Sequence, residues 1–585
     1  MQFKRYARPF AAAAIALPML AACGGSDNNN NNNNNNSDPA TRSTQFGQVT
    51  GVNDAGASGT LSWKGIPYAK APVGALRWKA PADPDAWATA KSTKSFAPAC
   101  VQYGRIYGPG ANNTWDATVG TTLNQAVGSE DCLYLNVWRP ASDTGNLPVI
   151  VFYHGGSNVS GYTADPVYDG ANLARTANAV VVTVNFRLGI FGFMNLPQLK
   201  TGDASNDSGN FAILDSIKAL QFVNKNIASF GGDPNNVTIM GQSAGAINVY
   251  ALLTSPQMAN ASPKLFHKSV PLSGGLSLAS NLPAGSIPTM SPASTYLAQG
   301  NALLKQVLVA DGRATDATVD AYIATQTPAQ LADYMRAKDP ALLLNVLLGK
   351  LAALGLAGSG PIPDGTVVPT DAIAAINAGN YVKGPVMAGN TRDEGKLFPS
   401  FLPLVGGSGN ARIVTDAQLV STQINYKPDA APQIGIEQWI AASYLPVDKP
   451  GTGFTAVSQE LNRRFLLASA INMLDTLKAK QPEVWYYQFN WDKEPAPWND
   501  IYGAAHLFDL PFIFGNFGPS LMANIMNTTA NRGGRLDLSD AMMKSLGSFA
   551  RTGNPNDAAL GVTWPAWPRK VIFDASLTAK AISVQ

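Results

Sequence analysis

The 585-residue chain is poor in residues that bind metals. It has only three histidines and three cysteines, and it contains neither an H-E-x-x-H nor a C-x-x-C motif. Such spacings bring zinc ligands together on one helix or one turn. The sequence therefore predicts no metal site, and we expect the protein to act without a cofactor.

Charged residues are also scarce, at 14% of the chain, and neither sign dominates. The formal net charge is +3. Three cations, Lys4, Arg5 and Arg8, lie in an N-terminal segment that we expect to be removed. The remaining chain then has as many cations as anions, so no basic surface is left to suggest nucleic-acid binding.

Long apolar runs are missing as well. The run at 341–357 is interrupted by Asn345 and Lys350, and the apolar core of the N-terminal segment is shorter than the roughly 20 residues of a membrane-spanning helix. There is no internal repeat and no second linker. Nothing in the pattern therefore divides the chain into several folded domains.

The first 22 residues have the pattern of an export signal. A basic start is followed by a short apolar core and by Leu20-Ala21-Ala22-Cys23. This ending resembles a bacterial lipobox, which implies cleavage before Cys23 and a lipid anchor on its thiol. The residue after the cysteine is Gly24. In a double-membrane bacterium the absence of aspartate at this position resembles the outer-membrane sorting pattern. The alternative is an ordinary signal peptide and a secreted or periplasmic protein.

Residues 23–45 are predicted to form a disordered tether. They include nine consecutive asparagines, Asn28 to Asn36, in a polar stretch with nothing apolar to bury. This tether would hold the domain predicted at 46–585 away from the membrane to which Cys23 is anchored.

The segment FGGDPNNVTIMGQSAG, residues 230–245, has the pattern of a strand, a sharp turn and a helix. Val237 to Met240 is β-branched and apolar, and the run after Gly245 has helical character. The turn is a Gly-x-Ser-x-Gly elbow, whose glycines let the backbone bend tightly and expose the serine hydroxyl. Ser243 is therefore the candidate nucleophile, and free N–H groups at the helix start face any oxyanion formed beside it.

Strand and helix patterns alternate on both sides of this elbow. Four buried strands and one amphipathic helix are predicted, the strands at 148–153, 179–184, 265–275 and 385–389 and the helix at 211–230. Short strand-like runs occur between 46 and 138, and residues 294–358 are mostly helical. The alternation predicts an α/β sheet whose strand order stays open.

Three segments resemble those of type-B carboxylesterases, the α/β-hydrolase family that includes the cholinesterases. The elbow segment is similar to the active-serine signature of that family. Glu130 to Trp138 is similar to its second signature, and Gly65 to Trp78 to its N-terminal part. The resemblance implies a single α/β-hydrolase domain with a mostly parallel sheet flanked by helices. It also implies helical cap insertions, with residues 294–358 as the roof of the active site.

The same resemblance implies a serine hydrolase that cleaves small carboxylic esters through an acyl-enzyme, with water as the second substrate. A serine hydroxyl needs a base within hydrogen-bond reach and an acid that orients this base. His154 opens a glycine-rich loop, and His267 lies in a predicted core strand. His506 is left as the base, in a segment that resembles the family's catalytic histidine loop.

The acid should lie between the serine and the histidine in chain order, as in other α/β-hydrolases. Glu394, within Asp393-Glu394-Gly395, stands where the family has its acid. Asp393 is the alternative. Ser273, in the Ser-Gly-Gly turn, is a candidate to support Glu394 from behind.

His154-Gly155-Gly156-Ser157 resembles the family's oxyanion loop. The N–H groups of Gly156, Ser157 and Ala244 are therefore expected to bind the oxyanion. Ser157 is a departure, because it stands where the family usually has a third glycine.

With Cys23 assigned to the lipid, Cys100 and Cys132 remain in a chain addressed to an oxidising compartment, and they should pair. Their positions resemble the family's first disulfide, and two free buried thiols are the alternative. The enclosed loop carries three aromatic residues that either line the substrate entrance or pack the loop, namely Tyr103, Tyr107 and Trp115.

Two other functions stay open. One is a lipase that acts on longer-chain lipids, and the other is a cholinesterase-like binding module without catalysis. The second would require loss of activity with Ser243, Glu394 and His506 all present, so ester hydrolysis is the expected function. The acyl and alcohol specificity and the oligomeric state are not predicted.

Overall fold

The computed structural model describes residues 38–142 and 144–585. The predicted signal segment, Cys23 and most of the predicted tether lie outside the described residues. Residues 39–585 form one unit. Its first strand, β1 (Thr41–Thr44), begins before the domain start predicted at residue 46.

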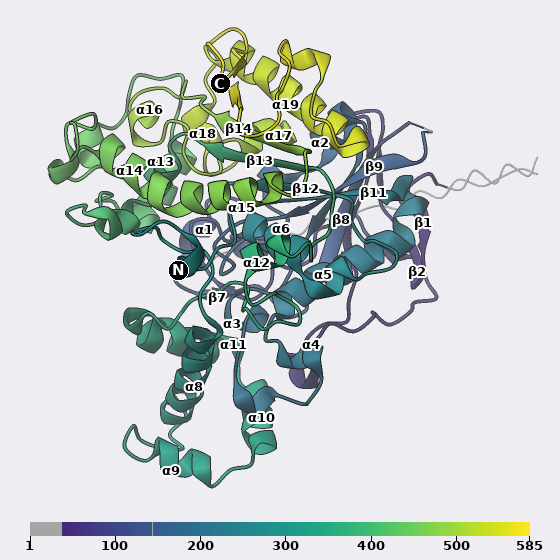
Figure 1. Cartoon of the computed structure of the whole chain (residues 1–585), viewed down its shortest axis with the longest axis vertical. Coiled ribbons are helices and arrows are strands. Elements are labelled where there is room, and N and C mark those ends of the chain that lie inside the picture. The colour runs from purple at the N-terminus through teal and green to yellow at the C-terminus, as the bar shows by residue number, and fades with distance from the viewer. Residues whose placement is uncertain (1–37, 143) are drawn as a thin grey trace, which may run out of the picture. The chain divides into compact units, whose positions relative to one another are not determined.

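An 11-stranded mixed sheet runs through this unit (Figure 1), in the order β16-β15-β14-β13-β12-β11-β9-β10-β8-β4-β3. The strands from β10 to β15 in that order are parallel, and the remaining pairs at both edges are antiparallel. Their bounds are β3 (Val52–Asp54), β4 (Thr60–Pro67), β8 (Tyr134–Pro140), β9 (Leu147–Tyr153), β10 (Val180–Val184), β11 (Gly232–Gln242), β12 (Lys268–Leu272), β13 (Val386–Thr391), β14 (Val484–Phe489), β15 (Val571–Phe573) and β16 (Ser583–Val584). The predicted α/β-hydrolase fold is confirmed, as the comparisons below also show.

Five further short strands lie outside this sheet. A three-stranded sheet has the order β1-β2-β5, and a two-stranded sheet pairs β6 with β7. Besides β1, the bounds are β2 (Gly47–Thr50), β5 (Lys91–Ser92), β6 (Gln102–Tyr103) and β7 (Ala126–Val127).

Helices cover both faces of the large sheet, so the sheet separates two apolar cores. α5, α6 and α15 pack into one core, and α2, α17 and α19 into the other. In β9 the side chains of Val149 and Val151 belong to the first core, and those of Ile150 and Phe152 to the second. This alternation is the reason that a parallel strand buried on both faces has a continuous apolar sequence.

The α-helices differ widely in length. Their bounds are α1 (Val119–Thr122), α2 (Ala171–Ala177), α3 (Gly189–Gly192), α4 (Ala204–Asp207), α5 (Phe211–Asn226), α6 (Ala244–Thr254), α7 (Pro256–Ala259), α8 (Ala293–Ala310), α9 (Val319–Ala324), α10 (Pro328–Arg336), α11 (Pro340–Val346), α12 (Ala372–Asn377), α13 (Asp416–Asn425), α14 (Phe454–Asn462), α15 (Ala468–Lys478), α16 (Trp498–Ile501), α17 (Leu510–Phe514), α18 (Ala523–Met526) and α19 (Arg532–Thr552). No helix of the described part is long and apolar enough to cross a bilayer.

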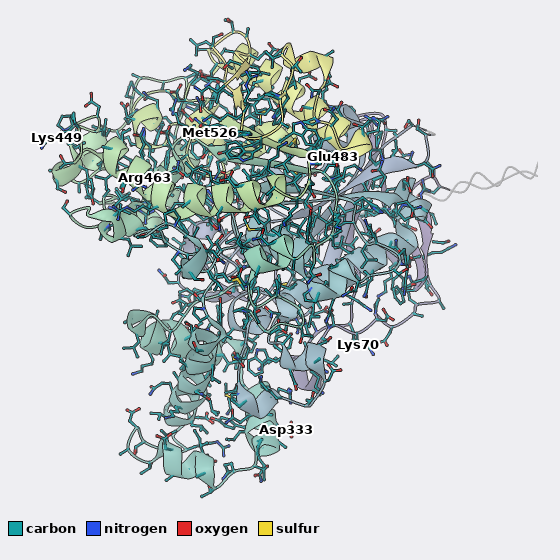
Figure 2. All side chains as sticks on the ribbon, viewed as in Figure 1. Lys70, Asp333, Lys449, Arg463, Glu483 and Met526 are labelled. Carbon is teal, nitrogen blue, oxygen red and sulfur yellow. A yellow bond between two sulfur atoms is a disulfide. The ribbon has the colours of Figure 1, made fainter. Side chains whose placement is uncertain are left out.

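The helical segment predicted at 294–358 is present as α8 to α11, which extend away from the sheet (Figure 1). In Figure 2 the label Asp333 marks α10 of this segment in the lower part of the view, away from Met526 on α18 in the upper part. Leu343 and Leu344 of the apolar run at 341–357 are buried in the core that also holds α5. The run is packed α-helix up to Val346, continues as a π turn at Leu347–Leu351 and a 3-10 turn at Ala352–Leu354, and becomes exposed at Leu354.

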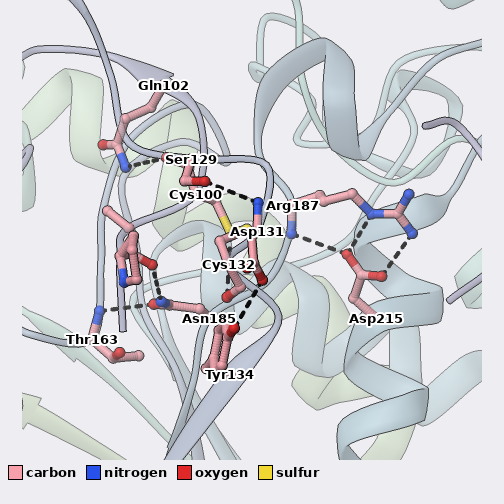
Figure 3. The surroundings of a disulfide bond; sticks show 12 residues. Cys100, Gln102, Ser129, Asp131, Cys132, Tyr134, Thr163, Asn185, Arg187 and Asp215 are labelled. Carbon is pink, nitrogen blue, oxygen red and sulfur yellow. Dashed lines mark hydrogen bonds and ion pairs between the residues drawn. A yellow bond between two sulfur atoms is a disulfide. The ribbon is translucent and has the colours of Figure 1, made fainter. Parts of the chain in front are cut away.

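Cys100 and Cys132 form a disulfide, which confirms the predicted pairing. Figure 3 shows that the bond lies beside the buried ion pair of Arg187 with Asp215. The two cysteines are 32 residues apart in sequence. Restricting the unfolded chain to a loop of this size stabilises the fold by roughly 3–4 kcal/mol in the chain-entropy estimate.

Candidate active site

The predicted catalytic residues come from three separate loops at one edge of the sheet. Ser243 follows β11, Glu394 follows β13, and His506 lies in the loop after β14 and α16. The carboxyl ends of parallel strands meet at a single edge, where open α/β sheets bind their ligands. The topology therefore brings together residues that are up to 263 positions apart in the printed sequence.

Ser243 lies on the sharp turn that its glycines predict. Its φ is +57° and its ψ −122°, an unfavourable conformation for a residue with a side chain. The Ser243 N–H donates to the carbonyl of Leu272 at 2.8 Å and so ties the turn to β12. A Cβ at Gly241 would lie 2.3 Å from the Gly245 oxygen, and one at Gly245 would lie 2.1 Å from the Tyr153 oxygen. Both flanking positions therefore require glycine.

His506 and Glu394 form a buried hydrogen bond between Nδ1 and Oε2. The second carboxylate oxygen of Glu394 accepts from the Thr391 N–H at 2.8 Å and from the Asn390 amide at 2.9 Å. Both side chains are nearly inaccessible to solvent. The Glu394 and His506 side chains are thus held in place by packing and by hydrogen bonds.

Burial by itself would raise the pKa of Glu394, but the neighbouring groups outweigh it. His506 is the main one, and the Ser273 hydroxyl and the Thr391 N–H add to its effect, so the pKa of Glu394 lies below the ordinary value. The Ser273 hydroxyl lacks a hydrogen bond of regular geometry to any described residue. The Ser273 hydroxyl lowers the pKa of Glu394, as the supporting role predicted for it requires, but it forms no regular hydrogen bond to the carboxylate.

Gln242 contacts the other side of His506, which sequence reasoning missed. Its Nε2 lies 3.0 Å from His506 Nε2. Because the Nδ1–H of His506 donates to Glu394, Nε2 of the neutral ring carries a lone pair. This lone pair accepts from the Gln242 amide. Gln242 directly precedes Ser243, so its place inside the Gly-x-Ser-x-Gly motif was the available signal.

The other two histidines lie outside this arrangement. His154 is buried, with Nδ1 2.8 Å from the Gly155 oxygen, and burial lowers its pKa to about 4. His267 is half-buried, and its Nδ1 accepts from the Val237 N–H at 3.2 Å. Burial, Lys268 and Lys264 lower the pKa of His267, which therefore has charged neighbours.

The predicted oxyanion loop borders the nucleophile. Gly156, Ser157 and Ser243 line one cavity, and Ala244 is the first residue of α6, where a backbone N–H has no partner within the helix. Gly156 has φ +102° and Ser157 φ +56°. Ser157 thus adopts a conformation that glycine adopts without strain, which explains why a glycine would suit this position.

Two adjoining cavities lead to Ser243. The inner one, about 100 Å³, is lined by Ser243, His506 and Gln242 together with Asp165 and apolar side chains. The outer one, about 240 Å³, is lined mainly by residues 397–419 and 439–454. The residues shared by both are Tyr107, Gly156, Ser157, Leu397 and Phe398.

The walls of these cavities correct one expectation and decide between two open alternatives. No residue of the helical segment 294–358 lines either cavity, so within the described chain this segment is not the roof of the site. Of the three aromatics in the disulfide loop, Tyr107 lines both cavities, whereas Tyr103 and Trp115 pack against the two cores.

Asp393, the alternative acid, points elsewhere. Its carboxylate pairs with Arg392 at 2.7 Å and accepts from the Ala504 N–H at 3.1 Å. The Asp393 N–H also donates to the Ala504 carbonyl at 2.8 Å. Asp393 therefore ties the loop of Glu394 to the loop of His506, and among the described residues its carboxylate makes no hydrogen bond to the imidazole.

A model of the carboxylesterase family matches residues 38–575. The chain belongs to the carboxylesterase family.

The chain is 31% identical over 553 residues to para-nitrobenzyl esterase of Bacillus subtilis, covering 92% of this chain and 95% of that protein. It is 31% identical over 532 residues to fumonisin B1 esterase of Sphingopyxis macrogoltabida, covering 90% and 85%. A solved PNB esterase structure superposes with a TM-score of 0.68 at 27% identity, covering 94% of this chain and 97% of that one. The protein is a carboxylic ester hydrolase with the α/β-hydrolase fold.

Asp509, close behind His506, gives a prediction for stability. Its side chain is fully buried and accepts from the Tyr487 hydroxyl at 2.7 Å, and burial raises its pKa from 3.8 to about 6. Between these pH values the unfolded chain loses this proton while the folded chain keeps it, so stability falls as pH rises. We expect Asp509→Asn, which cannot ionise, to gain up to about 3 kcal/mol relative to wild type between pH 4 and pH 6.5.

Urea unfolding at a series of pH values measures this difference. The exposed Asp448 is a matched control, and Asp448→Asn should show no such trend. A stability difference between Asp509→Asn and wild type that is constant with pH would contradict the assignment.

Proposed function

We propose that this carboxylesterase uses Ser243 as nucleophile, His506 as base and Glu394 as orienting acid, and that it hydrolyses small-molecule esters through an acyl-enzyme. The observation that carries the proposal is the buried Glu394–His506 pair, because it leaves the acceptor Nε2 of His506 on the side of the Ser243 backbone turn, and both residues line the same cavity. A base oriented in this way is what a serine hydroxyl needs.

The reaction proceeds in two halves. As Ser243 Oγ bonds to the ester carbonyl carbon, its proton passes to His506 Nε2, and the N–H groups of Gly156, Ser157 and Ala244 stabilise the oxyanion. The carbon–oxygen bond to the alcohol then breaks, and the leaving oxygen takes the proton from His506. Water repeats these steps on the acyl-enzyme, releases the carboxylic acid and restores Ser243.

Gln242 acts before the first step. Its amide occupies the His506 lone pair that must receive the Ser243 proton. The amide therefore has to release Nε2 when substrate enters, as is common for hydrogen bonds that reorganise in the Michaelis complex. Until then it holds the imidazole in the orientation that Glu394 sets.

We also propose that the protein is exported and anchored through a lipid on Cys23, in the outer membrane if the host has two membranes. The support is the Leu20-Ala21-Ala22-Cys23 ending and the asparagine run behind it. The first strand begins at Thr41, so the polar run lies between the anchoring residue and the fold.

The nucleophile is tested first. Ser243→Ala should lower kcat for 4-nitrophenyl butyrate by about 10⁴-fold or more, because no other group can form the acyl-enzyme. Thermal unfolding should stay close to that of wild type. A fluorophosphonate should label Ser243 in the wild type and no residue in the variant, and full activity of Ser243→Ala would refute the mechanism.

A series of nitrophenyl esters of increasing acyl length, ending in emulsified triglyceride, separates an esterase from a lipase.

The two neighbouring carboxylates form a matched pair of variants. Glu394→Gln should lower kcat by about 10²- to 10⁴-fold, because the imidazolium then loses its stabilising charge. Asp393→Asn should mainly lower stability, by roughly 1–3 kcal/mol, because Asp393 joins two loops. Steady-state kinetics and melting curves measure both effects. Equal losses of kcat in the two variants would overturn the assignment.

The anchor is tested by cell fractionation with labelling by a radioactive fatty acid. The wild type should be labelled and found with membranes, and Cys23→Ser should abolish both properties, because one cysteine carries all the acyl chains. An unlabelled wild type in the soluble fraction would mean that the segment is an ordinary signal peptide.

A further inference from the structure

The outer cavity has more cationic donors than anionic acceptors. Arg105, Lys396 and Arg412 line it, and Asp416 is the carboxylate among its lining residues. Asp416 already forms an ion pair with Arg412. Lys396 is largely buried, and its ammonium donates to the Asp500 carbonyl at 3.0 Å. The guanidinium groups of Arg105 and Arg412 are more accessible than the Lys396 ammonium and are therefore the better placed donors for a ligand.

Each guanidinium has donors that the protein does not use. The Arg105 side chain is exposed and makes no hydrogen bond or ion pair with any residue that the structure describes. In Arg412, Nη2 donates to Asp416, whereas Nη1 has no partner in the described chain and is not fully buried. Because both guanidinium groups are charged and have unused N–H donors, an anionic ligand that accepts from them forms charge-assisted hydrogen bonds.

These donors lie on the path to the nucleophile. Tyr107 lines both the outer cavity and the inner cavity of Ser243. Arg412 and Asp416 line the outer cavity together with Tyr107, and their charges act on the Tyr107 hydroxyl. A substrate bound at Ser243 can therefore extend past Tyr107 to the guanidinium groups.

The inner cavity has the opposite charge. Its acidic lining residue is Asp165, and its other walls include Tyr168, Phe398 and Met522. A carboxylate of the substrate would be repelled there once Asp165 ionises, and it would be attracted in the outer cavity. The charges thus favour one orientation of an anionic substrate.

We propose that the outer cavity binds a carboxylate of the substrate through Arg105 and Arg412, so that the enzyme prefers esters with an anionic group remote from the scissile bond. The proposal rests on the function proposed above and adds a substrate class to it. Guanidinium groups suit this role because their planar donors match the two oxygens of a carboxylate.

Two pairs of esters test the preference, one with the charge on the acyl side and one with the charge on the alcohol side. The first pair is 4-nitrophenyl hydrogen adipate and its neutral isostere 4-nitrophenyl 6-methylheptanoate. The second is 4-carboxyphenyl butyrate and 4-isopropylphenyl butyrate. In at least one pair the wild type should show a kcat/KM about tenfold or more higher for the anionic ester, mainly through a lower KM, since charge-assisted hydrogen bonds are worth this much.

Arginine variants then assign the preference to the cavity. Arg105→Ala should reduce the ratio of anionic to neutral kcat/KM about tenfold, and Arg105→Lys, which keeps the charge but not the planar fork, should lie between the two. Arg412→Lys should also lower the ratio, with melting curves to confirm folding because Arg412 pairs with Asp416. Arg569 is exposed and lines neither cavity, so Arg569→Ala should leave the ratio unchanged.

Three outcomes are distinct. A wild type that hydrolyses the neutral esters at least as well as the anionic ones in both pairs would overturn the proposal while leaving ester hydrolysis intact. A preference that persists in both Arg105→Ala and Arg412→Lys would also overturn it, because the anion would then be bound elsewhere. Absence of hydrolysis of all four esters would instead count against the proposed function.

Discussion

The buried contact between Glu394 and His506 is the constraint on which the site depends. A carboxylate buried at this depth is unfavourable unless its oxygens are compensated, and here the imidazole, the Thr391 N–H and the Asn390 amide do so. Two of these partners lie at the end of β13 and the third on a loop more than a hundred residues later. The contact therefore forms only when the parallel sheet is in register.

Backbone contacts around this pair restrict the remaining freedom of the loops. Asp393 and Ala504 exchange hydrogen bonds between the acid loop and the histidine loop, and the N–H of Ser243 binds to the end of β12. The glycines at 241 and 245 are needed because neighbouring backbone approaches within about 2 Å of where a Cβ would stand. The positions of the proposed catalytic residues are thus set by strand ends and by hydrogen-bonded turns next to them.

Substrate selection lies on different segments from the chemistry. The cavity walls come from the disulfide loop near Tyr107 and from residues 397–419 and 439–454, which are largely loops and short helices. Such segments tolerate substitution without disturbing the sheet, so one catalytic edge can serve many esters. Arg105 and Arg412, with their unused guanidinium donors, belong to these wall segments.

The sequence by itself determined the features that rest on local pattern. The strands around Ser243, the elbow and the helix behind it follow from β-branched runs, paired glycines and helical spacing, and the shortage of histidines singled out His506. Only the tertiary structure decided the strand order, the contact of Gln242 with His506, the separate role of Asp393 and the absence of 294–358 from the cavity walls. These depend on contacts between residues far apart in the chain. A local pattern gives the direction of a side chain relative to its own element, but not which distant element will lie opposite it.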